Sequence, residues 1–335
     1  MSCMANNMAS LSALSIARMP YLSAREKILV SEALGNDPLC SLRPGDIEAI
    51  VRRRIGDAPW DPQAWTAAAF RDKAYLESAR GSSYSYLDPG YPPILRETAR
   101  PPFMLYVRGQ LPPADRPSVA IVGTRFPTGR GLDAAVALGM EAAAAGVPVV
   151  SGLARGIDSA AHRGALAGGG LTFAVLGRGV DEVYPKSNKD LASSMVRSGG
   201  GIISEYAPGT PPSRWTFPER NRILAGLCRS TIVVEAPGGS GALISAAFAL
   251  EEGRDVYVAA SCQGGVRSAG SDSLVADGAV TLASFIDIIN DWRSGRGGAL
   301  FADRQGIRRR RMWRTSRPAH ARRAVLATLH PMRRA

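Results

Sequence analysis

The stretch Val119-Ala-Ile-Val-Gly-Thr-Arg125 decides the fold, because four apolar residues run directly into a glycine and a basic side chain. A helix-forming segment rich in alanine and leucine follows over residues 128–145, and a second apolar strand is predicted over residues 147–150. The same alternation continues to residue 292. Apolar strands that alternate with helices indicate a parallel sheet covered on both faces. The sequence therefore predicts an α/β protein with a Rossmann-like, doubly wound, mostly parallel sheet over residues 118–293.

The other predicted elements extend this pattern in both directions. We expect a helix after Arg220 and further helices over residues 159–167, 189–197, 241–252 and 284–292. We expect strands over residues 171–176, 201–204, 231–234, 255–258 and 279–282. Residues 1–87 are typical of short helices and are predicted to form a small N-terminal helical module. A proline-rich stretch over residues 88–117 is predicted to be an extended connector.

The net charge of +12 is concentrated near the C-terminal end. Residues 300–335 hold eleven arginines and one acidic residue, Asp303, so the first 299 residues balance 30 basic against 28 acidic side chains. We therefore expect residues 294–335 to form an arginine-rich tail that binds polyanions without sequence specificity. The body of the chain is close to neutral, so its function depends on particular residues and not on bulk charge.

Composition bounds the class of protein. A hydrophobic content of 45% with 21% charged residues is typical of a globular chain and excludes a disordered one. No apolar stretch is long enough to cross a bilayer, and the N-terminus lacks the pattern of a signal peptide. The cysteines show no metal-ligand or disulfide spacing: Cys3, Cys40, Cys228 and Cys262. We expect a cytoplasmic protein with no membrane partner.

Glycine-rich and polar segments follow several predicted strands, at residues 123–131, 151–158, 177–189 and 235–241. Ligands of doubly wound sheets bind outside the carboxyl ends of the strands. The first segment lacks the G-x-G-x-x-G spacing of a dinucleotide site, and no Walker loop occurs, so neither class fits. Gly123, Thr124 and Arg125 still form a plausible phosphate cradle beside a helix start.

The run Phe217-Pro-Glu-Arg-Asn-Arg222 is predicted to be a loop that leads into an apolar helix. Arginines at a helix start can grip phosphates, and an aromatic ring beside them can stack on a base, a combination that suits single-stranded nucleic acid. In the alternative, Arg220 and Arg222 pair with nearby carboxylates while Phe217 fills the core. The segment alone leaves both open.

Catalytic and metal-binding constellations are poor. His162 is the single histidine of the sheet domain, and its place on a predicted helix favours a buried or capping role. Carboxylates near the strand ends more often cap helices or orient arginines than hold a metal: Asp158, Asp181, Glu205 and Glu235. We predict a protein that is not an enzyme and has no catalytic residue, metal or cofactor.

Together these stretches resemble the DNA-processing protein A family (DprA, also called Smf). The resemblance rests on ordered matches between residues 88 and 290, above all Ser151-Gly-Leu-Ala-Arg-Gly-Ile-Asp158 and Phe217-Pro-Glu-Arg-Asn-Arg222. It implies a homodimer that binds single-stranded DNA and delivers incoming strands to the RecA recombinase during natural transformation. With the basic residues at the strand ends, the predicted nucleic-acid-binding set is Gly123, Thr124, Arg125, Arg155, Lys186, Lys189, Phe217, Arg220, Asn221, Arg222 and Ser240.

The chain also departs from the family pattern. Arg130 replaces a usual tyrosine, and Glu219 replaces a basic residue in the pocket run, where it would repel phosphate unless it turns outward or pairs with Arg220 or Arg222. The arginine-rich tail stands in place of a full winged-helix domain, with residues 321–330 as a possible remnant. Residues 237–245 resemble the phosphate loop of nucleotide phosphoribohydrolases, although Ser245 replaces their acid. A nucleotide-binding protein or hydrolase of that type is the alternative.

Overall fold

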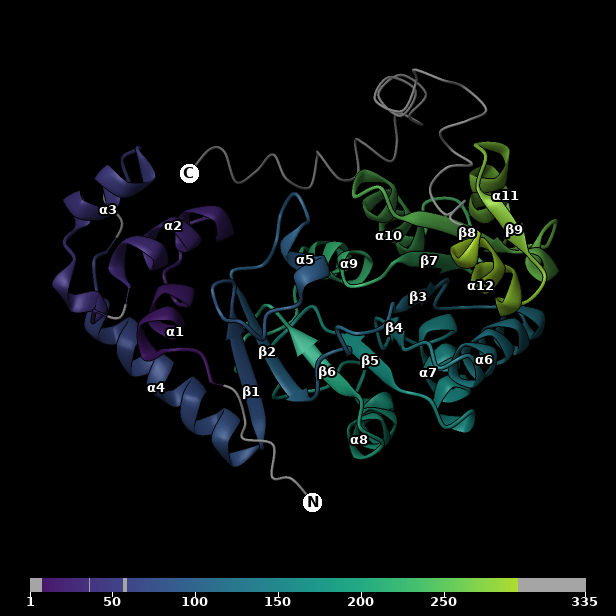
Figure 1. Ribbon diagram of the computed structural model, residues 1–335, viewed down its shortest axis with the longest axis horizontal. Helices are drawn as coiled ribbons and strands as arrows, with labels where there is room; N and C mark the ends of the chain where they lie inside the picture. Colours follow the sequence, from purple (N-terminus) through teal and green to yellow (C-terminus); the bar gives the residue numbers. More distant parts are fainter. Residues whose placement is uncertain (1–7, 36, 57–58, 295–335) are drawn as a thin grey trace.

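The computed structural model describes residues 8–35, 37–56 and 59–294, and its centre is one nine-stranded sheet (Figure 1). The strand order is β1-β2-β6-β5-β4-β3-β7-β8-β9. The seven strands β3 to β9 pair in parallel, while β2 runs antiparallel to both of its neighbours, β6 and the edge strand β1. The strands are β1 (Gly81–Ser85), β2 (Met104–Gly109), β3 (Val119–Val122), β4 (Val149–Ser151), β5 (Thr172–Val175), β6 (Gly201–Ser204), β7 (Ser230–Val233), β8 (Asp255–Ala259) and β9 (Val280–Leu282).

Helices cover both faces of this sheet. One face packs against α6, α7, α8 and α12 and the other against α5, α9 and α10, so that Ile121 and Val122 of β3 enter different cores. These helices are α5 (Pro93–Arg96), α6 (Gly129–Ala144), α7 (Ile157–Ala167), α8 (Lys189–Arg197), α9 (Thr216–Gly226), α10 (Gly241–Glu251) and α12 (Phe285–Arg293). The predicted doubly wound, mostly parallel α/β fold is confirmed.

The order of the strands in the sheet creates a topological switch point at β3. From β3 the chain proceeds outward through β4, β5 and β6, then returns to place β7 on the other side of β3. The loops that leave the carboxyl ends of β3 and β7 therefore diverge to opposite faces of the sheet. Such a divergence leaves a crevice that is the usual ligand site of open α/β sheets.

The sheet begins earlier along the chain than the sequence indicated. β1 lies in the region predicted to be helical, and β2 and α5 lie in the predicted connector. β1 reads Gly-Ser-Ser-Tyr-Ser, and Ser82, Ser83 and Ser85 are buried despite being polar, so the strand lacks the apolar alternation that would reveal it. A short helix, α11 (Ala269–Ala276), was also absent from the predicted elements.

The predicted loop over Phe217–Arg222 was wrong, because α9 starts at Thr216 and contains the whole run. Pro218 does not break the helix. It occupies the first turn, where a backbone N–H would have no intrahelical partner and the fixed φ of proline suits the helix. Phe217 and Arg220, three residues apart, therefore share one side of the helix, and Arg222 projects from another.

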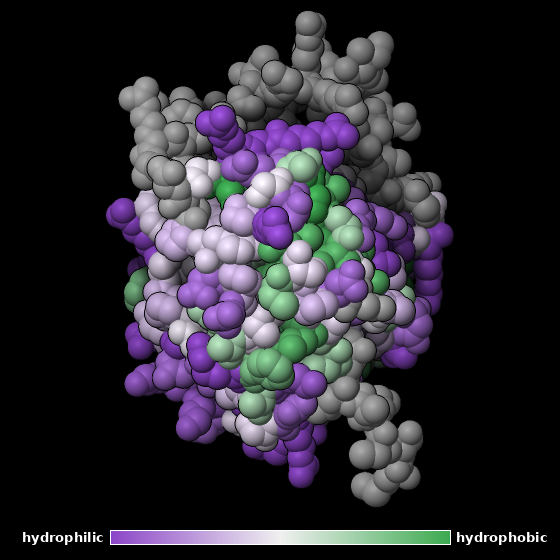
Figure 2. All heavy atoms as spheres, turned by 90° about the vertical axis from the view of Figure 1, so that its left-hand side faces the viewer, coloured by the Kyte–Doolittle hydropathy of each residue, from purple (hydrophilic) through white to green (hydrophobic). Residues whose placement is uncertain are grey.

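Four helices form the N-terminal module beside β1 and β2: α1 (Leu11–Ala17), α2 (Ala24–Leu34), α3 (Pro44–Val51) and α4 (Pro62–Ser78). Their core continues into the sheet, since Leu14 and Leu76 pack in the same cluster as Met104 and Tyr106 of β2. Figure 2 views this side, where a band of apolar surface runs between hydrophilic side chains. None of the described helices is both long and apolar enough to span a membrane.

The predicted arginine-rich tail, with its possible winged-helix remnant, lies outside the described residues, apart from Ser294.

Candidate nucleic-acid interface

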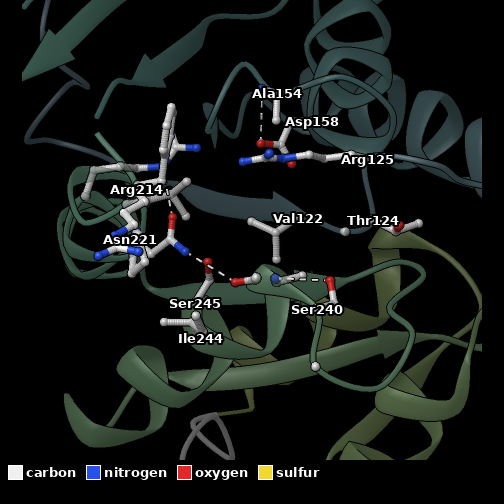
Figure 3. A pocket seen from close by; sticks show the side chains of 18 of the residues that line it. Val122, Thr124, Arg125, Ala154, Asp158, Arg214, Asn221, Ser240, Ile244 and Ser245 are labelled. Carbon is white, nitrogen blue, oxygen red and sulfur yellow. Dashed lines mark hydrogen bonds between the residues drawn. The ribbon is translucent and has the colours of Figure 1, made fainter. Parts of the chain in front are cut away.

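A cavity of about 830 Å³ opens at the carboxyl ends of the parallel strands (Figure 3). Its wall comes from the β3 turn, the start of α7, the loop before α9, α9 itself and the turn before α10. The cavity thus occupies the switch point between β3 and β7. In Figure 3, Thr124 and Arg125 lie on one side of it, and Arg214 and Asn221 lie on the other. This volume is in the range of small-molecule sites.

Two arginines of the cavity wall are available to a ligand. Arg125 and Arg214 are exposed, and neither forms an ion pair with any residue that the structure describes. The guanidinium of Arg125 lies 5.6 Å from the centre of the Phe217 ring, and that of Arg214 lies 4.3 Å from the Trp215 ring. Aromatic rings hold these cations without neutralising them.

Three aromatic side chains line the same cavity. The rings of Tyr184 and Phe217 lie 5.7 Å apart at an angle of 46°. Phe126 is 67% exposed and Tyr184 is 47% exposed, values that are high for apolar rings. An exposed aromatic face beside cations is the arrangement on which unpaired bases stack.

Arg220 supports the floor of the cavity. It is buried, with its Nη1 donating to the carbonyl oxygens of Gly152 (2.7 Å) and Val175, and its Nε donating to Oδ1 of Asn221 (2.9 Å). These bonds fix α9 to the ends of β4 and β5. Burial lowers the pKa of Arg220 and nearby Asp158 opposes that shift, so the side chain stays charged at neutral pH.

Asp158 faces Arg220 across Gly152. Its carboxylate accepts backbone N–H bonds from Gly152 (3.1 Å) and Ala154 (3.3 Å), and burial raises its pKa. A Cβ on Gly152 would lie 2.2 Å from the Arg220 guanidinium and 2.6 Å from the Asp158 carboxylate. The glycine of the Ser151–Asp158 motif is therefore required by the close approach of these two charged groups.

Arg222 does not line the cavity, in contrast to the sequence expectation. Its guanidinium forms ion pairs with Glu205 and Glu219 and donates to the carbonyl oxygen of Arg100 (2.6 Å). Glu219 also lies 3.6 Å from Arg100. For Arg222, the alternative interpretation of the Phe217–Arg222 run, an ion pair with nearby carboxylates, is thus confirmed. Glu219 does not face the cavity, and its charge is balanced by Arg100 and Arg222.

The glycine turns form the rest of the wall. Thr124 donates its N–H to the Glu235 carbonyl (2.7 Å), and Ser240 caps α10 by accepting from the Ala242 N–H (3.3 Å). The Glu235 carboxylate accepts from the backbone N–H (2.8 Å) and the hydroxyl (2.9 Å) of Thr128, at the start of α6. The Glu235 carboxylate thus holds Thr128, the N-cap residue of α6, in the helix-start role predicted for it. The start of α10 faces the cavity.

Seven of the eleven predicted binding residues line the cavity: Gly123, Thr124, Arg125, Phe217, Arg220, Asn221 and Ser240. The other four do not: Arg155, Lys186, Lys189 and Arg222. Three of these four are exposed at the same edge of the sheet, on the turn before α7 and around the start of α8.

The sequence reasoning missed Arg214, Phe126 and Tyr184 as wall residues. Arg214 stands three residues before Phe217, and Phe126 directly follows Arg125, so proximity to the two motifs was the available signal. His162 is fully buried, as expected, with Nδ1 2.6 Å from the Thr172 hydroxyl. Among the described residues, no group of three His, Cys, Asp or Glu side chains could hold a metal ion.

Fold and site define a Rossmann-like protein whose switch-point cavity combines aromatic rings with arginines that form no ion pair with the described residues. A sequence model of the family described as DNA recombination-mediator protein A matches residues 82–293. DNA processing protein DprA of Streptococcus pneumoniae is 42% identical over 226 residues, covering 66% of this chain and 78% of that protein. Protein Smf of Escherichia coli is 37% identical over 205 residues, covering 61% of this chain and 55% of that protein.

Solved structures agree with these sequence matches. The X-ray structure of the S. pneumoniae protein gives a TM-score of 0.69 at 33% identity, covering 85% of this chain and 98% of that one. DNA processing protein A from Helicobacter pylori, whose structure concerns its single-stranded DNA binding mode, gives 0.57 at 28% identity over 64% and 97% of the two chains. The chain belongs to the DNA recombination-mediator protein A family.

Proposed function

We propose that this protein binds single-stranded DNA in the switch-point cavity and acts without catalysing a reaction. The carrying observation is that Arg125 and Arg214, free of ion pairs with the described residues, stand beside the exposed rings of Phe126 and Tyr184. Stacking accepts any base, and cationic contacts follow the backbone, so binding is tolerant of sequence and weakens with salt. The H. pylori relative, whose structure concerns single-stranded DNA binding, supports this proposal.

The affinity for a labelled oligo-dT tests the proposal. Arg125→Ala removes a cation from the cavity, and we expect a loss of roughly tenfold at physiological salt, since a charge-assisted contact contributes on the order of 1–3 kcal/mol. Arg197→Ala is the matched control, because Arg197 is an exposed arginine at the far end of α8, near the opposite edge of the sheet. Equal affinities for wild type and Arg125→Ala would contradict the proposal.

The tail must be separated from the cavity in this experiment. Its twelve arginines are expected to bind polyanions through counterion release, and that contribution falls steeply with salt. Both variants keep the full chain, so the contribution of the tail is common to them. A difference between Arg125→Ala and Arg197→Ala therefore reports on the cavity alone.

We further propose that a cytoplasmic homodimer delivers the bound strand to RecA during natural transformation. Membership of the DNA recombination-mediator protein A family supports this role. Loading of RecA onto oligo-dT covered by single-strand-binding protein, followed through RecA ATP hydrolysis, is the measurement. The wild-type chain should shorten the lag and Arg125→Ala should not; a lag that the wild-type chain leaves unchanged would oppose the delivery role.

A nucleotide phosphoribohydrolase is the second candidate, since the turn over residues 237–241 and the start of α10 line the cavity. Ser245, which replaces the expected acid, also lines it. Among the described wall residues the single carboxylate is Asp158, which is engaged by backbone N–H groups. We expect no release of free base from nucleoside monophosphates; measurable turnover would favour the hydrolase.

A further inference from the structure

The N-terminal module shares a core with one wall of the cavity. Val180, in the loop after β5, lies in the same buried cluster as Leu14 of α1 and Leu76 of α4, and Ala207, in the loop after β6, packs against that cluster. The loop that contains Ala207 runs from residue 205 to residue 215 and then enters α9. Its last third supplies Pro212, Ser213 and Arg214 to the cavity wall.

Arg18 joins the module to this loop directly. It is the C-cap residue of α1, and its guanidinium forms two bonds to Asp72 of α4, one of them 2.7 Å long. The Nη2 of Arg18, which makes one of these two bonds, also donates to the carbonyl oxygen of Pro208 at 3.1 Å. Because Asp72 is 2% exposed, its carboxylate holds the guanidinium in one place. One side chain therefore binds α1, α4 and the loop after β6.

The loop depends on such contacts because it has few of its own. Pro208, Pro211 and Pro212 lack a backbone donor. Its first two residues are anchored by the ion pair of Glu205 with Arg222 and by the bond from the Tyr206 N–H to the Ser204 hydroxyl (3.0 Å). Further along, the Gly209 N–H donates to Asp181 (2.9 Å), and the Thr210 carbonyl accepts from Gly179 (3.0 Å). These two bonds hold the loop to its neighbour over residues 177–181, and Arg18 holds it to the module.

On the basis of the function proposed above, we propose that Arg18 is a positioning residue and that the N-terminal module braces the 205–215 loop for DNA binding. None of the described module residues lines the cavity, so the module acts through the loop and not by touching the strand. The brace fixes the path of the chain six residues before Arg214. Loss of the brace lets Arg214 and its neighbours sample positions that do not match the bound strand, which lowers affinity.

The test uses the full chain and two variants. Arg18→Met with Asp72→Asn removes the guanidinium and also neutralises the buried carboxylate, which avoids an unpaired charge in the core. Asp72→Asn alone is the matched control, because Arg18 keeps its donor to Pro208. Hydrogen exchange of the peptide over residues 205–215 reports on the loop, and oligo-dT affinity at several salt concentrations reports on binding.

We expect faster exchange over residues 205–215 in the double variant and an affinity loss of about three- to tenfold, with a salt slope that falls by no more than the roughly 0.7 expected of Arg214. Asp72→Asn, whose amide oxygen can still accept from the Arg18 guanidinium, should stay closer to wild type than the double variant does. Unchanged exchange and affinity in the folded double variant would overturn the brace, as would a loss of affinity without faster exchange over residues 205–215, which would mean direct contact with DNA. Arg125→Ala, measured in parallel, separates the two ideas: if it also binds like wild type, the proposed function fails instead.

Discussion

Arg222 of α9 is bound to Glu205, the residue that directly follows β6, and not to any group of the cavity. The side chains of this pair are 11% and 15% exposed, so the ion pair is largely withdrawn from water. Glu219, the nearer residue in sequence, makes the longer contact of 3.4 Å. An arginine that resembles a DNA contact in the sequence thus serves to hold α9 against the sheet.

Replacement of the two glutamates should therefore have unequal effects. Glu205→Gln leaves the guanidinium of Arg222 with a weaker partner in a largely buried position, and we expect a loss of about 1–3 kcal/mol in the free energy of unfolding. Glu219→Gln removes a longer, more exposed contact and should cost less than about 1 kcal/mol. Urea unfolding measures both, and equal losses would show that Glu205 is not the principal partner.

Gly152 should not tolerate a side chain. A Cβ there meets the Arg220 guanidinium and the Asp158 carboxylate, and overpacking of this kind costs about 1–3 kcal/mol. Gly129→Ala is the control, because Gly129 begins α6 and a Cβ added there would meet no other part of the chain within 4 Å. Thermal unfolding should separate the two variants, and a Gly152→Ala protein as stable as Gly129→Ala would disprove the close approach.

Arg214 should contribute to the salt dependence of DNA binding. Each phosphate contact to a single strand adds about 0.7 to the slope of log affinity against log salt. Arg214→Ala should therefore bind oligo-dT more weakly with a slope reduced by about 0.7, while Arg197→Ala keeps the wild-type slope. An Arg214→Ala slope equal to that of wild type would remove this residue from the phosphate contacts.

His162 should make stability sensitive to mild acid. Burial lowers its pKa from the ordinary 6.5 to about 3, so between these values the unfolded chain binds more protons than the folded one. Acidification below pH 6.5 then favours unfolding, by at most about 1.4 kcal/mol per pH unit. The Thr172 hydroxyl donates to the Val149 carbonyl, which leaves it to accept from Nδ1–H of the imidazole.

His162→Asn is the matched variant for that measurement, because an amide N–H can replace Nδ1–H without titrating. Urea unfolding of both proteins between about pH 7 and pH 5 isolates the histidine, since most carboxylates titrate below this window. We expect the stability of wild type to fall more steeply than that of the variant. Parallel curves would mean that His162 is protonated in the folded protein.

The parallel sheet was predictable because most of its strands are short apolar runs that alternate with helical segments, and some are followed directly by glycine, as at Val119–Val122. β1 was not predictable, because its buried serines are stabilised by tertiary hydrogen bonds, such as the one from the Ala9 N–H to the Ser83 hydroxyl. The extent of α9 was missed because a proline in the first turn reads as a break unless the helix start is known.

The position of the cavity could be predicted from the sequence, but not all of the side chains that line it. The glycine turns and Arg125 follow from the rule that ligands bind at the carboxyl ends of strands. The role of Arg222 could not be read locally, because its main partner, Glu205, is contributed by the end of a different element, β6. Arg214 belongs to no motif, and its place in the wall depends on the path of a proline-rich loop.

The shared core of the N-terminal module and the sheet determines which segment of this chain can be exchanged with a relative. β1 pairs with β2 along its whole length, from Gly81 opposite Arg108 to Ser85 opposite Met104. A cut at residue 87 would remove β1, leave β2 as an unprotected edge and bare the apolar surface of Tyr106, two features that promote aggregation. Chimeras between relatives should therefore exchange the N-terminal helices together with the sheet as one unit.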